Sequence, residues 1–415
     1  MTAAGLLRRH HDFRRLWLGA VVSQFGARVG QIATPLLAVT VLAAGPMQVG
    51  LLSAAQTAGL LVFGLPAGAW VDRMRRRPLM IAMDLVRAAL LMTIPVAAWL
   101  GLLGLWQLGI VVLLVGVASV FFDVAYLSYL PSLIGREHLL QGNARLQAGQ
   151  SVAVVAGPAT GGVLAGLIGA ANTLLATGVG FLASALALWR IHGAEAPPER
   201  AAKPSLRAEV AEGLRLVFGH PILRAIALCT STANLFMSIA LALNVLFLAR
   251  VVGLPASAIG AVLAALGLGG VVGALVSNRV AARIGQVRVV WVALLATQPC
   301  SLLLPLAAPG WRVGLFAAGW FVVGLGSTLY NVAQVSLRQA LCPDRLLGRM
   351  NATNRFVVWS TLPVGSVLGG LLGELLGIRG GLWLAGTGLS LAVLWLIYSP
   401  LRGMAELPEE AAWST

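Results

Sequence analysis

The chain has few charged residues for its length. Only 10% of its 415 residues are charged, and Lys203 is the single lysine, whereas soluble globular proteins carry about 25% charged residues. Hydrophobic residues make up 59% of the sequence, and the mean hydropathy is +0.89. This composition excludes a cytosolic enzyme, a secreted disulfide-stabilised scaffold and a nucleic-acid-binding domain.

The sequence also lacks the patterns that bind nucleotides, metals or acyl groups. It contains no GxxxxGK[ST] phosphate-binding loop and no GxSxG nucleophile turn. Its five histidines and three cysteines show no metal-ligand spacing, and we expect Cys229, Cys300 and Cys342 to be free, mostly buried thiols. We therefore expect no enzyme activity, no cofactor and no bound metal.

Long apolar runs are the main feature that is present. Each run is long enough to cross about 30 Å of hydrocarbon as a helix. The runs cover 14–42, 47–71, 78–101, 104–131, 139–168, 170–191, 220–249, 256–283, 286–308, 311–340, 345–376 and 379–401. The sequence therefore predicts an all-α polytopic membrane protein with 12 transmembrane helices.

The basic residues are distributed unequally between the connections on the two sides of the membrane. With these spans, 24 of the 29 Lys and Arg residues lie on one side, three lie on the other, and Arg28 and Arg87 lie inside spans. Because Lys and Arg collect on the cytoplasmic side, we expect both termini in the cytoplasm. The net charge of +15 then reflects membrane topology and not a nucleic-acid partner.

One hydrophilic stretch divides the chain into two sets of six spans. In residues 192–219, Leu206, Val210, Leu214 and Val217 form an apolar stripe at helical spacing. We expect an N-terminal six-helix bundle over 1–191, a cytoplasmic linker with an amphipathic helix over 192–219, a C-terminal six-helix bundle over 220–401, and a cytoplasmic tail over 402–415.

The two sets of spans are related by an internal repeat. A shift of 208 residues aligns 122–125 with 330–333, and 143–144 with 351–352. The same shift aligns Gly157, Gly161, Gly162 and Gly169 with Gly365, Gly369, Gly370 and Gly377. An offset of six spans preserves orientation, so the halves are predicted to be related by a pseudo-twofold axis along the membrane normal. The small residues spaced four apart in spans 5 and 11 favour an interface between the halves.

The loop after span 2 resembles a signature of the major facilitator superfamily. Residues 68–77 follow its pattern of glycine, three residues, Asp-Arg and then basic residues, with Arg75 in place of the second glycine. The resemblance implies a cytoplasmic gate in which Asp72 faces a helix N-terminus and Arg76 pairs with nearby acids. We assign Gly68, Asp72, Arg73, Arg76, Asp84 and Arg87 to this gate.

Span 5 resembles the GPxxGG motif of antiporters from the same superfamily, through Gly157, Pro158, Gly161 and Gly162. Residues 11–17, 130–133 and 143–144 are similar to bacterial efflux members of the enterobactin-exporter and macrolide-efflux type. These resemblances favour export over import; a proline and glycine kink without directional meaning is the alternative.

Charged residues inside the membrane point to the chemistry, because each costs about 2.5–3.5 kcal/mol at a helix centre. Arg28 shares a face of span 1 with Gln24 and Gln31, and Asp123 lies in span 4. The resemblance implies that spans 1, 4, 7 and 10 line a substrate cavity. We assign to this cavity Gln24, Arg28, Gln31, Phe122, Asp123, Tyr126, Asn234, Ser238, Asn244, Tyr330, Asn331 and Gln334.

We expect Arg28 and Asp123 to share a water-filled cavity and to bias each other's charge. Protonation of Asp123 would then couple transport to protons. Two other interpretations remain open, a structural hydrogen bond for Asp123 and a fixed interhelical pair for Arg28.

Together these features predict a secondary active transporter in the bacterial cytoplasmic membrane. We expect a monomer that alternates access and exports an amphipathic small molecule, such as a drug, antibiotic or other natural product, in exchange for protons. One alternative is an importer or a lipid or lysolipid transporter of the same fold. Another is a membrane scaffold or sensor that does not transport.

Overall fold

The structure, a computed structural model, describes residues 10–71, 73–135, 138–191, 206–342 and 346–404. Every regular element in these ranges is a helix. Eleven helices in the described part of the chain are long and apolar enough to cross a membrane. The thirty-residue helix α2 (His11–Thr40) is not among them, although it corresponds to the first predicted span. The all-helical membrane fold with twelve long helical segments agrees with the sequence prediction.

The described chain forms two compact units. The first contains Met1–Ala202 together with Leu248–Ala264, and the second contains Lys203–Phe247 together with Ala265–Thr415. The segment 248–264 therefore belongs to the first unit, whereas the sequence places it in the C-terminal bundle.

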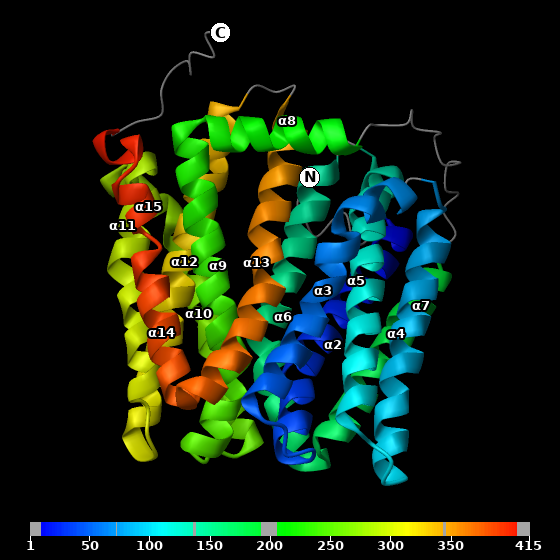
Figure 1. The fold of residues 1–415 in the computed structure, drawn as a ribbon. Coiled ribbons are helices and arrows are strands. Elements are labelled where there is room, and N and C mark those ends of the chain that lie inside the picture. The colour runs from blue at the N-terminus through cyan, green and yellow to red at the C-terminus, as the bar shows by residue number, and fades with distance from the viewer. Residues whose placement is uncertain (1–9, 72, 136–137, 192–205, 343–345, 405–415) are drawn as a thin grey trace. The chain divides into compact units, whose positions relative to one another are not determined.

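The first unit is built mainly from six long helices (Figure 1). These are α2, α3 (Pro46–Val71), α4 (Arg76–Trp99), α5 (Leu105–Ile134), α6 (Leu139–Ile168) and α7 (Ala170–Trp189). Helix α2 packs against α6 and α7, α4 packs against α5 and α7, and α3 packs against α5.

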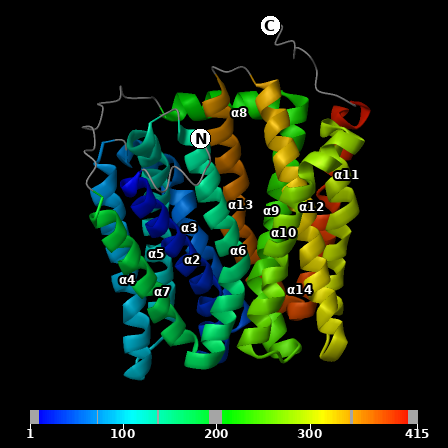
Figure 2. The ribbon, with the colours of Figure 1, turned by 180° about the vertical axis from the view of Figure 1, so that it is seen from behind.

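The second unit contains α9 (Pro221–Leu246), most of α10 (Ala256–Ile284) and the helices that follow (Figure 2). These are α11 (Gln286–Thr297), η3 (Gln298–Leu306), η4 (Gly310–Arg312), α12 (Val313–Leu341), α13 (Leu347–Leu375), α14 (Gly377–Leu391), α15 (Leu394–Ile397) and η6 (Pro400–Gly403). Between α9 and α10 the chain forms a π-helical turn, η2 (Phe247–Val251).

The same packing pattern occurs in both units. Helix α9 packs against α13 and α14, as α2 does against α6 and α7, and α11 packs against α12, as α4 does against α5. The turns also correspond, because Gly169 and Gly377, which the 208-residue shift aligns, have φ angles of 84° and 73°. Glycine adopts this left-handed conformation without a steric penalty.

Close helix crossings in each unit depend on glycine. In the first unit, a Cβ atom on Gly116 of α5 would lie 2.6 Å from the carbonyl oxygen of Gln56 in α3. In the second unit, a Cβ atom on Gly273 of α10 would lie 2.6 Å from the carbonyl oxygen of Leu325 in α12. These crossings have no room for a methyl group.

The expectation that the glycine ridges of spans 5 and 11 join the two halves is wrong for four of the glycines. Gly157 and Gly161 of α6 lie against α2, within the first unit. Gly365 and Gly369 of α13 lie against α9, within the second unit. The ridges therefore allow close packing inside each unit.

The predicted span 286–308 is not one α-helix. Helix α11 ends at Thr297, and the chain continues as the 3₁₀-helix η3, which carries Pro299 near its start and Pro305 inside. Proline lacks an N–H group and clashes with the preceding turn, which explains the change of helix type.

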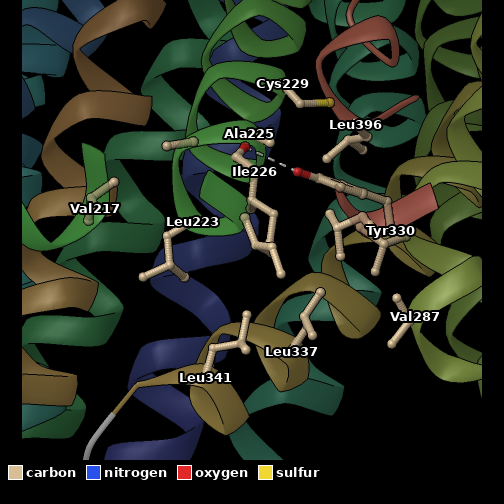
Figure 3. Packing of buried hydrophobic residues seen from close by; sticks show 14 of the residues in the cluster. Val217, Leu223, Ala225, Ile226, Cys229, Val287, Tyr330, Leu337, Leu341 and Leu396 are labelled. Atoms are coloured by element: carbon tan, nitrogen blue, oxygen red, sulfur yellow. Dashed lines mark hydrogen bonds between the residues drawn. The ribbon is translucent and has the colours of Figure 1, made fainter. Parts of the chain in front are cut away.

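Helix α8 (Leu206–Gly219) covers the segment for which the sequence predicts an amphipathic helix. It lies across the ends of α9 and α13 (Figure 1). Its Val217 is buried in the hydrophobic cluster that Figure 3 shows, together with Leu223 of α9 and Leu337 of α12. His220 caps α9, its Nδ1 accepting from Leu223 N at 3.5 Å, and partial burial lowers the pKa of His220 because the charged ring loses water.

Candidate functional site

Polar side chains of α2 form one part of the candidate site. Arg28 is half-buried and donates from Nη1 to Gln31 Oε1 at 3.1 Å, while Gln24 is half-buried and Gln31 is exposed. A Cβ atom on Gly157 of α6 would collide with Arg28 Cβ. The glycine of the GPxxGG motif therefore lets α6 approach α2 at Arg28.

Asp123 of α5 forms the second part. Its side chain is exposed, and its carboxylate lies within electrostatic range of the guanidinium groups of both Arg28 and Arg87. The structure thus brings Arg28 and Asp123 into one charge cluster within the first unit. Their role in transport stays a prediction.

The neighbouring aromatic residues of α5 are core residues. Phe122 and Tyr126 are 2% and 5% exposed, and their rings stack with centroids 6.2 Å apart. The Phe122 ring packs over the Arg87 guanidinium, and the assignment of Phe122 and Tyr126 to a cavity lining stays a prediction.

Asp84 and Arg87 of α4 lie in the core of the first unit, and their assignment to the loop gate stays a prediction. Both are buried, and they form an ion pair whose contacts run to Ser23 of α2, Ser119 of α5 and Phe181 of α7. Although they are close to the loop in sequence, they point into the first unit and pair with each other.

The loop after α3 is anchored by a residue that sequence reasoning missed. Arg77 donates from Nε to the Leu188 carbonyl oxygen at 3.0 Å and from Nη2 to the Trp189 carbonyl oxygen at 2.5 Å. Arg15 of α2 donates to the Arg190 carbonyl oxygen at 2.5 Å. Two guanidinium groups therefore cover the C-terminal end of α7, where cations are stabilised by the helix dipole.

The other predicted gate residues are only partly described. Gly68 is half-buried, and a Cβ atom there would meet nothing within 4 Å. Arg73 is exposed and Arg76 is half-buried, while Asp72 lies outside the described residues. The latch between Asp72 and a helix N-terminus stays a prediction.

The remaining glycines of the GPxxGG motif pack on two helices. A Cβ atom on Gly161 would lie 2.9 Å from the Val29 carbonyl oxygen of α2. A Cβ atom on Gly162 would lie 2.5 Å from the Ala256 carbonyl oxygen and 2.7 Å from Gly260 Cα at the start of α10. The motif thus provides close contact with α2 and with the segment 248–264, all within the first unit.

The second unit holds the other predicted cavity residues, and several are buried. Tyr330 is 6% exposed and its hydroxyl lies 2.5 Å from Thr230 Oγ1 (Figure 3 shows its ring in the hydrophobic cluster). Asn244 is 1% exposed; with its side-chain oxygen towards Trp320, it accepts from Trp320 Nε1 at 3.3 Å. Tyr330 and Asn244 thus contact neighbouring helices of their own unit, and their assignment to a cavity surface stays a prediction.

The other polar residues of α9 and α12 differ in exposure. Ser238 is buried where α9 meets Gly365 of α13, and Asn234 is half-buried. Asn331 is exposed and accepts from Gln334 Nε2 at 2.9 Å, whereas Gln334 itself is buried. Asn331 and Asn234 are the accessible candidates in this unit.

In the described part of the chain, no group of three or more His, Cys, Asp and Glu side chains could hold a metal ion.

The chain is similar in sequence to bacterial efflux proteins. It is 29% identical to the multidrug efflux pump Tap of Mycolicibacterium fortuitum, over 80% of this chain and 82% of that protein. It is 27% identical to the enterobactin exporter EntS of Salmonella typhimurium (strain LT2), over 97% of this chain and 96% of that protein.

Solved structures with the same fold are transporters. A bacterial homologue of the iron transporter ferroportin in an inward-facing state has a TM-score of 0.75 at 17% identity, covering 93% of this chain and 98% of that chain. The nucleoside transporter NupG has a TM-score of 0.73 at 12% identity, covering 93% of this chain and 98% of that chain.

The family model described as transmembrane secretion effector matches residues 4–414. The chain is therefore a multi-pass membrane transporter of the transmembrane secretion effector family, within the major facilitator superfamily.

Proposed function

We propose that this transporter exports an amphipathic small molecule across the bacterial cytoplasmic membrane in exchange for protons. Two kinds of observation support this proposal. The relatives Tap and EntS are named as an efflux pump and an exporter. The basic residues of the connections favour cytoplasmic termini, and we propose that the chain works as a monomer.

The observation that carries the proposal is the charge cluster of Arg28 and Asp123. Charged groups in membrane-spanning helices are costly and are found mainly where ions or substrates move. Asp123 is exposed on α5 and is attracted by two guanidinium groups, Arg28 and Arg87. An accessible carboxylate is able to exchange protons with water.

The mechanism follows from the electrostatics of this cluster. When Asp123 is ionised, it balances the charge of Arg28; when it binds a proton, the guanidinium loses that partner. A substrate or proton that binds one conformation better than the other shifts the equilibrium between them. Alternating access then exchanges a proton for a substrate molecule in each cycle.

Asp123→Asn is expected to reduce gradient-driven export about tenfold, which corresponds to about 1.4 kcal/mol. Asparagine keeps the size and the hydrogen bonding of the side chain but cannot ionise. The measurement is uptake of rhodamine 123 (a cation) and carboxyfluorescein (an anion) into everted membrane vesicles under an imposed pH gradient, with and without an uncoupler. The matched control is Glu374→Gln, which neutralises an exposed acid of α13 and should leave uptake unchanged.

The same assay separates the alternatives. Uptake into everted vesicles means export, whereas loss of preloaded dye from them means import. A scaffold or sensor would move neither dye, although binding could still raise its melting temperature. Full gradient-driven uptake by Asp123→Asn would contradict the proton-carrying role of Asp123.

A further inference from the structure

Helix α4 contains a buried ion pair that the proposed mechanism does not use. Asp84 and Arg87 are three residues apart, and they are 0% and 3% exposed. Removing two charges from water is costly, so a pair of this kind is weak evidence for stability alone.

Three neighbouring helices contact the Arg87 guanidinium. Its Cζ atom lies 4.3 Å from the ring centroids of both Phe122 of α5 and Phe181 of α7. It also donates to Ser23 Oγ of α2 at 3.3 Å and to Ser119 Oγ of α5 at 3.4 Å. Aromatic faces attract a desolvated cation, so Arg87 remains charged and stably positioned without depending on Asp84 alone.

The second oxygen of the Asp84 carboxylate, Oδ2, is the candidate site for a proton. One oxygen accepts from Arg87, while Asp84 Oδ2 is buried without a well-formed hydrogen bond. Ser184 Oγ of α7, which lies beside the carboxylate, is also buried without one. The Ser184 hydroxyl can donate to the ionised carboxylate and accept from the protonated one, so this arrangement accommodates Asp84 in both states.

The charges around the pair are balanced by one further acid. Arg87 is attracted by Asp123 as well as by Asp84, and Asp123 also attracts Arg28 of α2. Tyr126 of α5 also lies within electrostatic range of Asp123, while α7 presents Phe181 and Ser184 to the pair. Arg87 is therefore attracted by two acids of the first unit, and Asp123 can balance its charge when Asp84 is neutral.

We propose that Asp84 is a second proton-binding site of the transporter, coupled to Asp123 through Arg87. This inference rests on the proposed proton-coupled function and adds the residue that holds the proton inside the first unit. The proton comes from water, converts the carboxylate of Asp84 to a carboxyl group, and later returns to water on the other side. Arg87 keeps its own protons throughout, and Asp123 balances its charge while Asp84 is neutral.

An infrared pH titration of the purified full-length protein in liposomes tests this site without any transport measurement. The wild type should show a protonated carboxyl band that titrates, and Asp84→Asn should remove it. Asp12→Asn is the matched control, because Asp12 pairs with Arg15 at the same three-residue spacing, at 2.9 Å, but is partly exposed. A band that Asp84→Asn leaves unchanged would overturn the proposal.

Transport measurements then test the coupling. Asp84→Asn should reduce pH-gradient-driven uptake of rhodamine 123 or carboxyfluorescein at least fivefold, while exchange of the same dye without a gradient stays within twofold of the wild type. An equal fall of both activities, or no change in either, would mean that the pair is only structural. If the wild type itself shows no gradient-driven uptake, the proposed function fails, and the infrared result still decides whether Asp84 binds a proton.

A second variant covers the case in which Asp84→Asn does not fold. Ser184→Ala removes the hydroxyl beside Asp84 and keeps both charges. It should shift the midpoint of the infrared titration by about half a pH unit or more, and an unchanged midpoint would count against the site.

Discussion

Replacing Arg87 with leucine is expected to destabilise the folded protein by about 3–5 kcal/mol at neutral pH. Arg87 is 3% exposed and is the ion-pair partner of Asp84, which is fully buried. Without the guanidinium, an unpaired carboxylate remains among apolar helices, and both aromatic rings lose their cation. The melting temperature of the purified protein, together with its denaturant midpoint, measures the effect.

The double variant Asp84→Leu, Arg87→Leu separates the cost of an unpaired charge from the cost of lost packing. Removing both charges leaves no orphaned ion, so we expect most of the lost stability to return. The single variant should also be less destabilised at acidic pH, because protonation of Asp84 removes the unpaired charge. A double variant as unstable as Arg87→Leu would show that packing, and not charge, dominates this site.

The surface pair Arg15 and Asp12 provides the control for this experiment. It has the same three-residue spacing, but its side chains are 35% and 27% exposed. An exposed pair contributes at most about 1 kcal/mol, so Asp12→Asn, which keeps the bond from Arg15 to the Arg190 carbonyl oxygen, should change the melting temperature far less than Arg87→Leu.

Gly116→Ala is expected to destabilise the protein. Overpacking a core costs about 1–3 kcal/mol, and we expect a value near the top of this range. The added Cβ atom would lie 2.6 Å from the Gln56 carbonyl oxygen, and a Cβ atom on the facing Gly59 would lie 2.7 Å from Val117 N. Both neighbouring atoms belong to the backbone, so α3 and α5 would have to separate. A fall in melting temperature and in the yield of folded protein measures this.

Gly109→Ala on the same helix is the matched control. A Cβ atom there would lie 3.8 Å from Leu52 Cδ2, which is an ordinary contact. Because alanine favours helix by about 1 kcal/mol over glycine, Gly109→Ala should leave stability unchanged or raise it. A loss at Gly109 equal to that at Gly116 would show that the α3–α5 crossing is not the cause.

The number and order of the long helices could be predicted from sequence, because apolar runs of sufficient length have few alternatives to a membrane-spanning helix. The internal repeat was also visible, and its aligned residues Gly169 and Gly377 share a left-handed turn conformation. Helix type within a span was harder to predict. The change from α11 to the 3₁₀-helix η3 depends on local geometry around Pro299 and Pro305.

Sequence reasoning was weakest where the direction of a side chain depends on a helix far away in sequence. Asp84 and Arg87 follow the loop closely, yet Phe122 and Phe181 from two other helices enclose Arg87. The spacing of Gly157 and Gly161 shows that α6 has a face of small residues. It does not show which helix packs against that face. Arg77 was missed because its partners are backbone carbonyl groups of α7, which no sequence motif marks.

The most direct test of the proposed transport cycle is proton movement in liposomes that contain the purified protein and a trapped pH-sensitive dye. Adding an exported substrate on one side should move protons in the opposite direction, and the proton signal should disappear in Asp123→Asn. Substrate movement without any proton movement in the wild type would contradict proton exchange as the driving reaction.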